Sequence, residues 1–286
     1  MHPYNHRMIS IAVGLALAAA VLHACWNILL KEEGDPLLLA ARAVGVSAVF
    51  AAPLGLAAWL VLGRPGLALG AYPLAGASGL IEVLYFVGLS AAYRRGDISL
   101  VYPTARGGAA ALAVVAGIVL LRESLHPAEL VGVVVLVLGM WLVRSPLGSG
   151  PAMRPALLTA VCIAAYTTLD RIGVRLGPAW LYGWILWTIT AVLLTGWVHI
   201  AAKPARSEES PSIGRAAAIG VLMTVAYLLV LLALAVAPLT IVAPVRESAV
   251  VGVAAWGVWR LGEPGARVRL VGSLIILAGI TVVAVT

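Results

Sequence analysis

Long apolar runs, separated by short polar segments, follow one another along the whole chain. Each run is about 17–25 residues long, which is the length of an α-helix that crosses a lipid bilayer. The separators are rich in Gly, Pro and charged residues, and the strict alternation of a membrane β-strand is absent. The pattern predicts an all-α integral membrane protein with ten transmembrane helices, at residues 9–31, 36–62, 72–93, 99–121, 127–143, 154–176, 180–201, 213–235, 240–260 and 267–285.

Several features of the chain recur at an offset of 140 residues. Glu123, Leu130-Val131-Gly132 and Gly139 reappear as Glu263, Leu270-Val271-Gly272 and Gly279, and three further residues, Trp26, Lys31 and Arg106, have counterparts in Tyr166, Arg171 and Arg246. The offset predicts two five-helix repeats, residues 1–145 and 146–286, which together form one transmembrane domain. Because five is odd, the second repeat is inverted relative to the first, and a polar substrate would bind between the repeats near the bilayer midplane.

Two pairs of glycines lie about two helical turns apart within the repeats. Gly132 and Gly139 share one face of the fifth predicted helix, and Gly272 and Gly279 share one face of the tenth. Small residues at this spacing let another helix approach closely. We expect packing within the chain, with a homodimer as the alternative.

The composition excludes a soluble domain. Hydrophobic residues make up 62% and charged residues 11% of the chain, and the mean hydropathy is +1.05, whereas a soluble domain carries about 25% charged residues. The net charge of +7 comes from basic residues in short loops, so we predict a lipid bilayer and no nucleic acid as a partner. Five basic residues fall on one side of the predicted membrane and eleven on the other. The positive-inside rule then places both termini outside.

Two five-helix halves, the Trp26-Asn27 pair late in the first helix, Pro103 and Pro244 early in the fourth and ninth, and the glutamates that follow them resemble the EamA type of the drug/metabolite transporter superfamily. The resemblance covers almost the whole chain. It implies ten helices in two inverted repeats, transport of small metabolites or drugs by alternating access, and a cavity lined by helices 1, 3, 4, 6, 8 and 9. Family members commonly keep their termini in the cytoplasm, which disagrees with the charge count and leaves import versus export open.

Arg106 and Arg246 are the leading candidates for substrate binding. Each lies six or seven residues into its helix, roughly 10 Å deep at 1.5 Å per residue. Two guanidinium groups that converge on a wet cavity would hold a carboxylate, phosphate or phosphonate. Alternatively, each arginine neutralises a buried acid such as Glu247 or Glu82.

Glu82, near the middle of the third helix, is the leading candidate for proton coupling. Glu247 and Asp170 are further candidates for the same role. A carboxylate at membrane depth carries a proton, binds a cation or pairs with an arginine. The last of these would make its role structural.

Polar and aromatic residues of the same helices complete the predicted substrate site. His23, Trp26 and Asn27 lie close together on the first helix, and Tyr166 takes the place of Trp26 in the second half. Interhelical hydrogen bonding and packing are the alternative interpretation of these residues. Three tyrosines are weaker candidates for the cavity wall, namely Tyr85, Tyr102 and Tyr227. An interfacial aromatic belt is expected at the start of the seventh helix, formed by Trp180, Tyr182, Trp184 and Trp187.

Three classes of function compete. We predict a secondary transporter of a small zwitterion or anion, such as an amino acid or aminophosphonate, that is coupled to protons and resides in the cell membrane. An exporter of lipophilic cations, with Glu82 as counter-ion, is the runner-up. An integral membrane enzyme is the second class, but the sequence contains no metal-spaced cluster, nucleophile elbow or nucleotide loop. A channel or a passive membrane scaffold is the third. We therefore predict no catalytic residue, no metal and no cofactor.

Overall fold

The computed structural model describes residues 6–32, 35–123, 127–144, 150–200, 212–263 and 265–285. Apolar side chains on all sides make these segments helical in a membrane, where every backbone group must be bonded within its own segment. The helices are α1 (His6–Lys31), α2 (Pro36–Val61), α3 (Ala71–Arg95), α4 (Ile98–Val119), α5 (Pro127–Arg144), α6 (Met153–Gly173), α7 (Ala179–Ile200), α8 (Ile213–Val236), α9 (Leu239–Arg246), α10 (Val250–Trp259) and α11 (Ala266–Val285).

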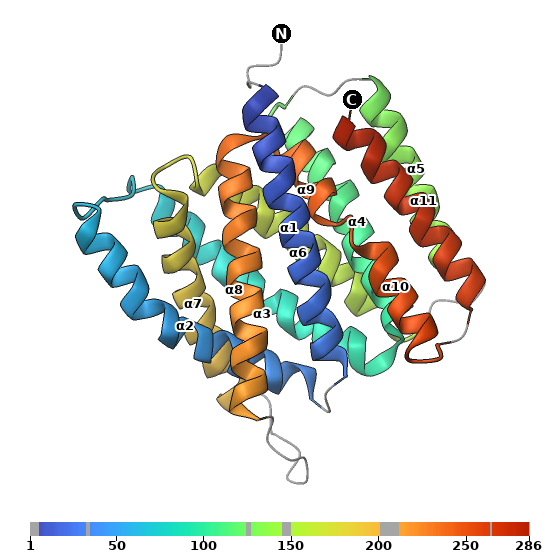
Figure 1. Cartoon of the computed structure of the whole chain (residues 1–286), viewed down its shortest axis with the longest axis horizontal. Coiled ribbons are helices and arrows are strands. Elements are labelled where there is room, and N and C mark those ends of the chain that lie inside the picture. Colours follow the sequence, from blue (N-terminus) through green and yellow to red (C-terminus); the bar gives the residue numbers. More distant parts are fainter. Residues whose placement is uncertain are drawn as a thin grey trace.

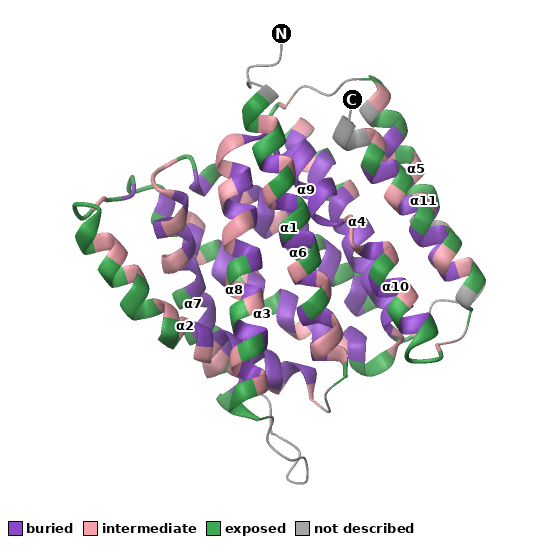
Figure 2. Cartoon of the chain, in the orientation of Figure 1, coloured by how far each residue is buried: buried purple, intermediate pink, exposed green. Residues whose placement is uncertain are grey.

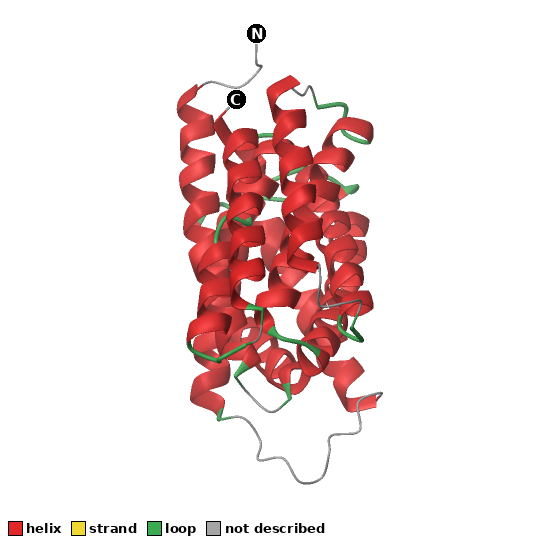
Figure 3. Ribbon diagram, turned by 90° about the vertical axis from the view of Figure 1, so that its right-hand side faces the viewer, coloured by secondary structure: helices red, strands yellow, loops and turns green. Residues whose placement is uncertain are grey.

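The predicted all-α membrane fold with ten spans is confirmed. Within the described residues all regular structure is helical (Figure 3). Eight candidate spans in this part of the chain, counting α9 and α10 as one, are long and apolar enough to cross a bilayer. The two remaining helices, α5 and α11, have 18 and 20 residues.

The ninth span differs from the continuous helix that we predicted. It consists of two short helices, α9 and α10, separated by a turn at residues 247–249 (Figure 1). Pro244 lies within the last turn of α9, and a proline removes one backbone donor and crowds the preceding turn. Its counterpart Pro103 lies in the first turns of α4, and α4 continues unbroken to Val119.

The most buried helices form the centre of the bundle. α4 and α9 are almost entirely buried, whereas α2, α5 and α11 present exposed apolar residues on their outer faces (Figure 2). Exposed side chains such as Val49, Phe50 and Leu54 on α2 suit contact with lipid rather than water. Polar groups that are costly in lipid are thus concentrated where protein surrounds them.

The repeated glycines join α5 to α11. A Cβ atom at Gly139 would lie 2.6 Å from the backbone nitrogen of Ile276, and one at Gly279 would lie 2.5 Å from that of Leu136. The two helices therefore touch backbone to backbone, and the predicted packing within the chain is confirmed. A homodimer through another surface stays a prediction.

Contacts between the two halves come in matching pairs. α1 packs against α8, and α3, which is the counterpart of α8, packs against α6, the counterpart of α1. α2 likewise packs against α8 and α7 against α3. This pairing agrees with the repeat boundaries 1–145 and 146–286, which remain a prediction. It also places the polar residues of α1, α3, α4, α6, α8 and α9 in one interior.

Candidate functional site

A cluster of ionisable residues occupies the interior between the two halves. Arg106 and Arg246 are 2% and 1% exposed, and three acidic residues, Glu82, Asp170 and Glu247, are 3% exposed or less. Charges buried this deeply must be paired or hydrogen-bonded. The bonds that they form divide the cluster into two regions of opposite charge.

The first region, which we call the basic pole, consists of Arg106, Arg246 and Glu247. Arg106 Nη1 lies 3.0 Å from Glu247 Oε2, and Arg246 Nε lies 2.8 Å from Glu247 Oε1. Arg246 Nη1 also donates to Thr167 Oγ1 at 3.2 Å. Two cations share one anion, so the pole keeps a formal charge of +1. The guanidinium of Arg106 also lies 5.3 Å from the ring centre of Tyr102, where cation–π attraction is effective.

The break in the ninth span places Glu247 between the arginines. Glu247 is the first residue after α9, with φ −91° and ψ 4°, outside the helical range. On a continuous helix, consecutive residues point about 100° apart. The break therefore removes the conflict between Arg246 and Glu247 that a regular helix would impose, and their side chains bond each other.

Two hydrogen-bond donors of this region have no partner among the described residues. They are Arg106 Nη2 and His23 Nε2, both buried. Trp26 Nε1 donates to His23 Nδ1 at 2.9 Å, so Nδ1 is the acceptor and the neutral imidazole carries its hydrogen on Nε2. The charges of Arg106 and Arg246 interact electrostatically with His23. One of the two buried donors thus belongs to the positively charged basic pole, and the other is exposed to its field.

Asn27 fits the alternative interpretation, interhelical hydrogen bonding. Its Nδ2 donates to the carbonyl of His23 at 2.8 Å, and its Oδ1 accepts from Tyr93 Oη at 2.7 Å. The side chain therefore fixes α1 against α3. Whether it also meets a substrate stays a prediction.

The second region, which we call the acidic pole, consists of Glu82 and Asp170. Asp170 accepts hydrogen bonds from Ser78 at 2.6 Å, from Tyr182 at 3.1 Å and from Tyr227. Glu82 Oε2 accepts from Thr190 Oγ1 at 2.7 Å. Among the described residues, these carboxyl groups accept hydrogen bonds from hydroxyl groups, and neither forms an ion pair with an arginine or lysine.

A row of aromatic rings runs through the site. Tyr85 meets Tyr166 edge to face at 5.9 Å between ring centres, Tyr166 meets Tyr227 at 6.2 Å, and Tyr227 meets Trp187 at 5.8 Å. The four rings come from α3, α6, α8 and α7. Tyr166, Tyr85 and Tyr227, predicted as cavity residues, therefore lie side by side.

The repeated glutamates close the two ends of the site. Glu123, which follows α4, accepts from the backbone N–H groups of Leu239 and Thr240 at 2.9 Å each, and thereby caps α9. Glu263, which follows α10, accepts from those of Ile98 and Ser99 at 2.8 and 2.9 Å, and caps α4. A carboxylate at a helix N-terminus satisfies unpaired donors and the helix dipole.

Each cap has the same surroundings. A Cβ atom at Gly117 would lie 2.9 Å from Glu123 Oε2, and one at Gly257 would lie 2.5 Å from Glu263 Oε2. Each cap also has an arginine. Arg171 Nε lies 3.4 Å from Glu123 Oε1, and Arg269 Nη1 lies 3.7 Å from Glu263 Oε2. The glutamates thus tie each half to the central span of the other.

Comparison with known proteins finds a family match in the second half of the chain. Residues 153–285 match the model of the EamA-like transporter family. The second half of the chain is therefore similar in sequence to this family. The match confirms the resemblance to the EamA type predicted from the sequence, and together with the many apolar helices it supports a multi-pass membrane protein. No curated protein matches the chain.

A solved structure supports the same fold over the full length. Described only as the crystal structure of a protein, it has a TM-score of 0.71 and 18% sequence identity, and the match covers 96% of this chain and 98% of the other. At this identity the likeness concerns the fold alone.

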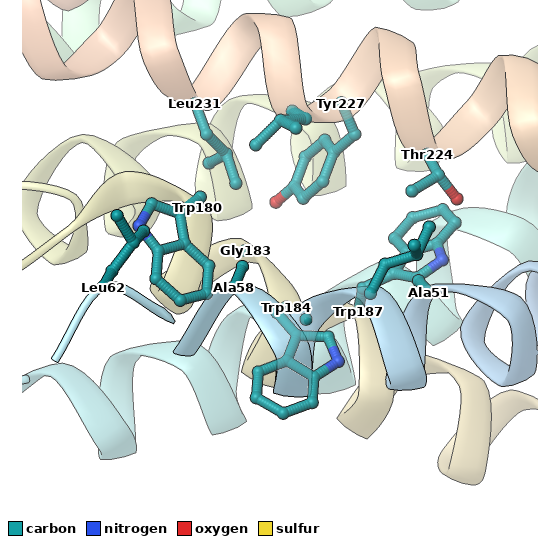
Figure 4. Close-up of a pocket in the computed structure, with 13 residues that line it drawn as sticks. Ala51, Ala58, Leu62, Trp180, Gly183, Trp184, Trp187, Thr224, Tyr227 and Leu231 are labelled. Atoms are coloured by element: carbon teal, nitrogen blue, oxygen red, sulfur yellow. The ribbon is translucent and has the colours of Figure 1, made fainter. Parts of the chain in front are cut away.

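The prediction of an interfacial aromatic belt at the start of α7 is partly wrong. Tyr182 and Trp187 are 0% and 6% exposed. The hydroxyl of Tyr182 donates to Asp170, and the indole of Trp187 donates to Ser47 at 3.0 Å. The first turns of α7 pack against α2 and α3 and so lie inside the bundle. Trp180 and Trp184 line a pocket instead (Figure 4).

Sequence reasoning missed most of the hydroxyl groups that bond the ionisable residues of this site. Ser78, Thr167, Tyr182 and Thr190 bond the ionisable residues, yet a lone Ser or Thr in an apolar helix has no distinctive pattern. Thr167 and Asp170 stand one turn apart on α6, and this spacing could have identified Thr167.

Proposed function

We propose that this protein transports a small zwitterion, such as an amino acid or an aminophosphonate, across the cell membrane by alternating access. The observation that carries the proposal is the pair of buried donors, Arg106 Nη2 and His23 Nε2, that have no partner in the described part of the chain. They accompany a pole with a formal charge of +1. Unpaired buried donors are costly unless something accepts from them. A carboxylate or phosphonate supplies acceptor oxygens and the compensating negative charge.

The acidic pole supports a zwitterion over a simple anion. Glu82 and Asp170 have hydroxyl partners but no ion pair among the described residues. An ammonium group beside them would supply the missing positive charge. A lipophilic cation, the runner-up, would satisfy this pole but leave the two donors of the basic pole unpaired. The zwitterion satisfies both.

Glu247 takes the place that we predicted for a substrate carboxylate. It accepts from both arginines, so the resident carboxylate and an incoming one would compete for them. Arg246 commits Nε to Glu247 and Nη1 to Thr167, whereas Arg106 keeps Nη2. We therefore assign the first substrate contact to Arg106.

Glu82 is our candidate for the proton carrier. A proton on Glu247 would weaken two ion pairs, whereas Glu82 forms none among the described residues. With Glu82 protonated, the acidic pole would carry a net charge of −1, from Asp170. Arrival of an ammonium group would favour release of the proton from Glu82. Such exchange would couple the proton gradient to transport.

Alternating access is supported by the two glutamate caps. α4 has 22 residues, about 33 Å at 1.5 Å per residue, and a cap lies at each of its ends. Opening the Glu123 cap would free α4 from α9 on one side of the membrane, and opening the Glu263 cap would free α10 from α4 on the other. Each cap is local, so one can open while the other holds.

The proposal is tested by uptake into proteoliposomes with a panel of amino acids, aminophosphonates and cationic dyes. We expect saturable uptake of at least one zwitterion. Arg106→Lys keeps the charge but loses the planar fork, and we expect the affinity to fall by about 1–3 kcal/mol, roughly 5- to 150-fold. Arg246→Lys is the matched control and should cost substrate affinity less. Wild-type affinity in both variants, or tighter binding of dyes than of any zwitterion, would contradict the proposal.

A further inference from the structure

A pocket of about 370 Å³ lies between α2, α7 and α8, next to the acidic pole (Figure 4). Its walls are three tryptophans of α7, Trp180, Trp184 and Trp187, with Tyr227 of α8 and leucines of α2 and α8. The volume suits part of a small ligand. A wall of flat rings and hydrocarbon selects a bulky apolar group.

Two aromatic residues of the wall connect the pocket to the ionisable cluster. The ring of Tyr227 faces the pocket, and its hydroxyl donates to Asp170. Trp187 lies in the wall, and Thr190, one turn further along α7, donates to Glu82. The acidic pole therefore lies directly behind the inner wall of the pocket.

The packing at Gly55 shapes the pocket. A Cβ atom there would lie 2.6 Å from the indole ring of Trp184, so only glycine lets this ring lie flat against α2. The indole Nε1 of Trp184 and the hydroxyl of Thr224, also in the wall, are buried and have no partner among the described residues. Both can bond an oxygen or nitrogen on an otherwise apolar ligand.

We propose that this pocket is the side-chain subsite of the transporter, and that its substrate is a zwitterion with a bulky apolar side chain. The inference rests on the proposed function. In this arrangement the Tyr227 ring moves out of the wall and the ammonium group takes the place of its hydroxyl at Asp170. The anionic group then lies at the basic pole and the side chain between the tryptophans. A zwitterion with a small side chain would leave the pocket without a ligand and would bind more weakly.

The test compares uptake of glycine and alanine with uptake of leucine and phenylalanine by the protein in proteoliposomes. We expect a KM at least about tenfold lower for the bulky pair, because a few buried methylene groups give discrimination of about 10- to 200-fold. Preference for glycine or alanine would overturn the subsite. If no zwitterion is taken up, the proposed function itself fails, which is a different result.

A substitution that fills the pocket gives a sharper test than the comparison of substrates alone. Ala58 lines the pocket, whereas its neighbour Ala57 is exposed on the outer face of α2. Ala58→Leu should raise the KM for leucine and phenylalanine about tenfold and leave that for alanine within about twofold. Ala57→Leu adds the same atoms outside and should change neither. An equal change for all four substrates in Ala58→Leu would overturn the proposal.

The competing occupant is an acyl chain of the bilayer. Lipids with brominated chains quench nearby tryptophans, and the share due to Trp184 is the difference between the wild type and Trp184→Phe. If leucine occupies the pocket, a saturating concentration should protect Trp184 by at least about twofold, and glycine should not. Quenching that leucine leaves unchanged would identify a lipid chain as the occupant and overturn the subsite.

Discussion

Two buried acidic residues, Glu247 and Glu82, have different surroundings. Glu247 accepts from two arginines at 2.8 and 3.0 Å, and removing it would leave uncompensated buried cations, which costs about 3–5 kcal/mol in buried pairs. Glu82 accepts from the hydroxyl of Thr190. A neutral residue at position 82 is therefore far better tolerated than one at position 247, and Glu82 can change charge during a cycle.

We predict that Glu82→Gln flattens the pH dependence of transport. The glutamine keeps the size of the side chain and a hydrogen bond to Thr190 but cannot release a proton. Initial uptake rates in proteoliposomes, measured with and without an imposed pH gradient, should differ in the wild type and coincide in the variant. Glu82→Asp keeps the carboxyl group and should retain the response. A pH profile unchanged in Glu82→Gln would leave Glu82 a structural residue.

The sequence predicted which residues carry charge inside the membrane, because every such residue is costly in lipid. Arg106, Arg246, Glu82 and Asp170 stand out for this reason. It could not predict their partners. Whether an arginine meets a substrate or Glu247 depends on a break of a few residues in the ninth span. The prolines could not predict this break, because Pro103, the counterpart of Pro244, lies in an unbroken helix.

At the scale of the elements, the ends of α4 and α9 are held by side chains from the opposite half. Glu123 and Glu263 each bond two backbone N–H groups. Lys31 and Arg171, predicted as counterparts, act on helix C-termini in the same way. Lys31 Nζ donates to the carbonyls of Tyr93 and Gly96 at 2.6 and 2.9 Å, and Arg171 donates to that of Leu234. These pairs complement the helix dipoles.

We predict that Glu123→Gln and Glu263→Gln open opposite ends of the transporter. Each variant loses the charge of one cap, worth about 1–2 kcal/mol, which is about a 5- to 30-fold shift between closed and open states. In a background with Cys25→Ala and Cys162→Ala, Thr167→Cys reports access to the site. An impermeant thiol reagent should react faster from the α4–α5 side in the first variant.

The second variant serves as the matched control for the first. Glu263→Gln should raise the labelling rate from the α10–α11 side, measured in vesicles of opposite orientation. If both variants raise labelling from the same side, or neither alters it, the caps only stabilise the fold. The glutamates were visible in the sequence as a repeat, but their targets required the packing of α4 against α9 and α10.

At the scale of the whole molecule, the hydrophobic pattern was sufficient for the architecture. Apolar length fixed the ten spans to within a few residues, and Gly139 and Gly279 identified the helices that pack most closely. The lateral pocket could not be predicted, because Trp180, Trp184 and Trp187 stand where an interfacial belt is expected. Only the approach of α2, with Gly55 beneath Trp184, turns these residues inward.

The orientation of the molecule in the membrane follows from its loops. Arg171 and Arg269 are among the sixteen basic residues that were counted on the two sides of the predicted membrane, five on one and eleven on the other. Both are buried in ion pairs and therefore contribute little to the positive-inside effect. They come from opposite sides, so the excess persists on the side of the α1–α2 and α3–α4 loops. We therefore predict that this side faces the cytoplasm and that both termini face outward, contrary to the topology that the family resemblance implies.

Two exposed glycines on opposite faces provide the test. Gly66 lies between α2 and α3, and Gly214 lies at the start of α8. In the background with Cys25→Ala and Cys162→Ala, Gly66→Cys should react with an impermeant maleimide in intact cells, whereas Gly214→Cys should react only after permeabilisation. The loop between α7 and α8 lies largely outside the described residues, and Gly214 reports the same face of the membrane. Ready labelling of Gly214→Cys in intact cells would reverse the orientation and with it the direction in which the Glu123 cap opens.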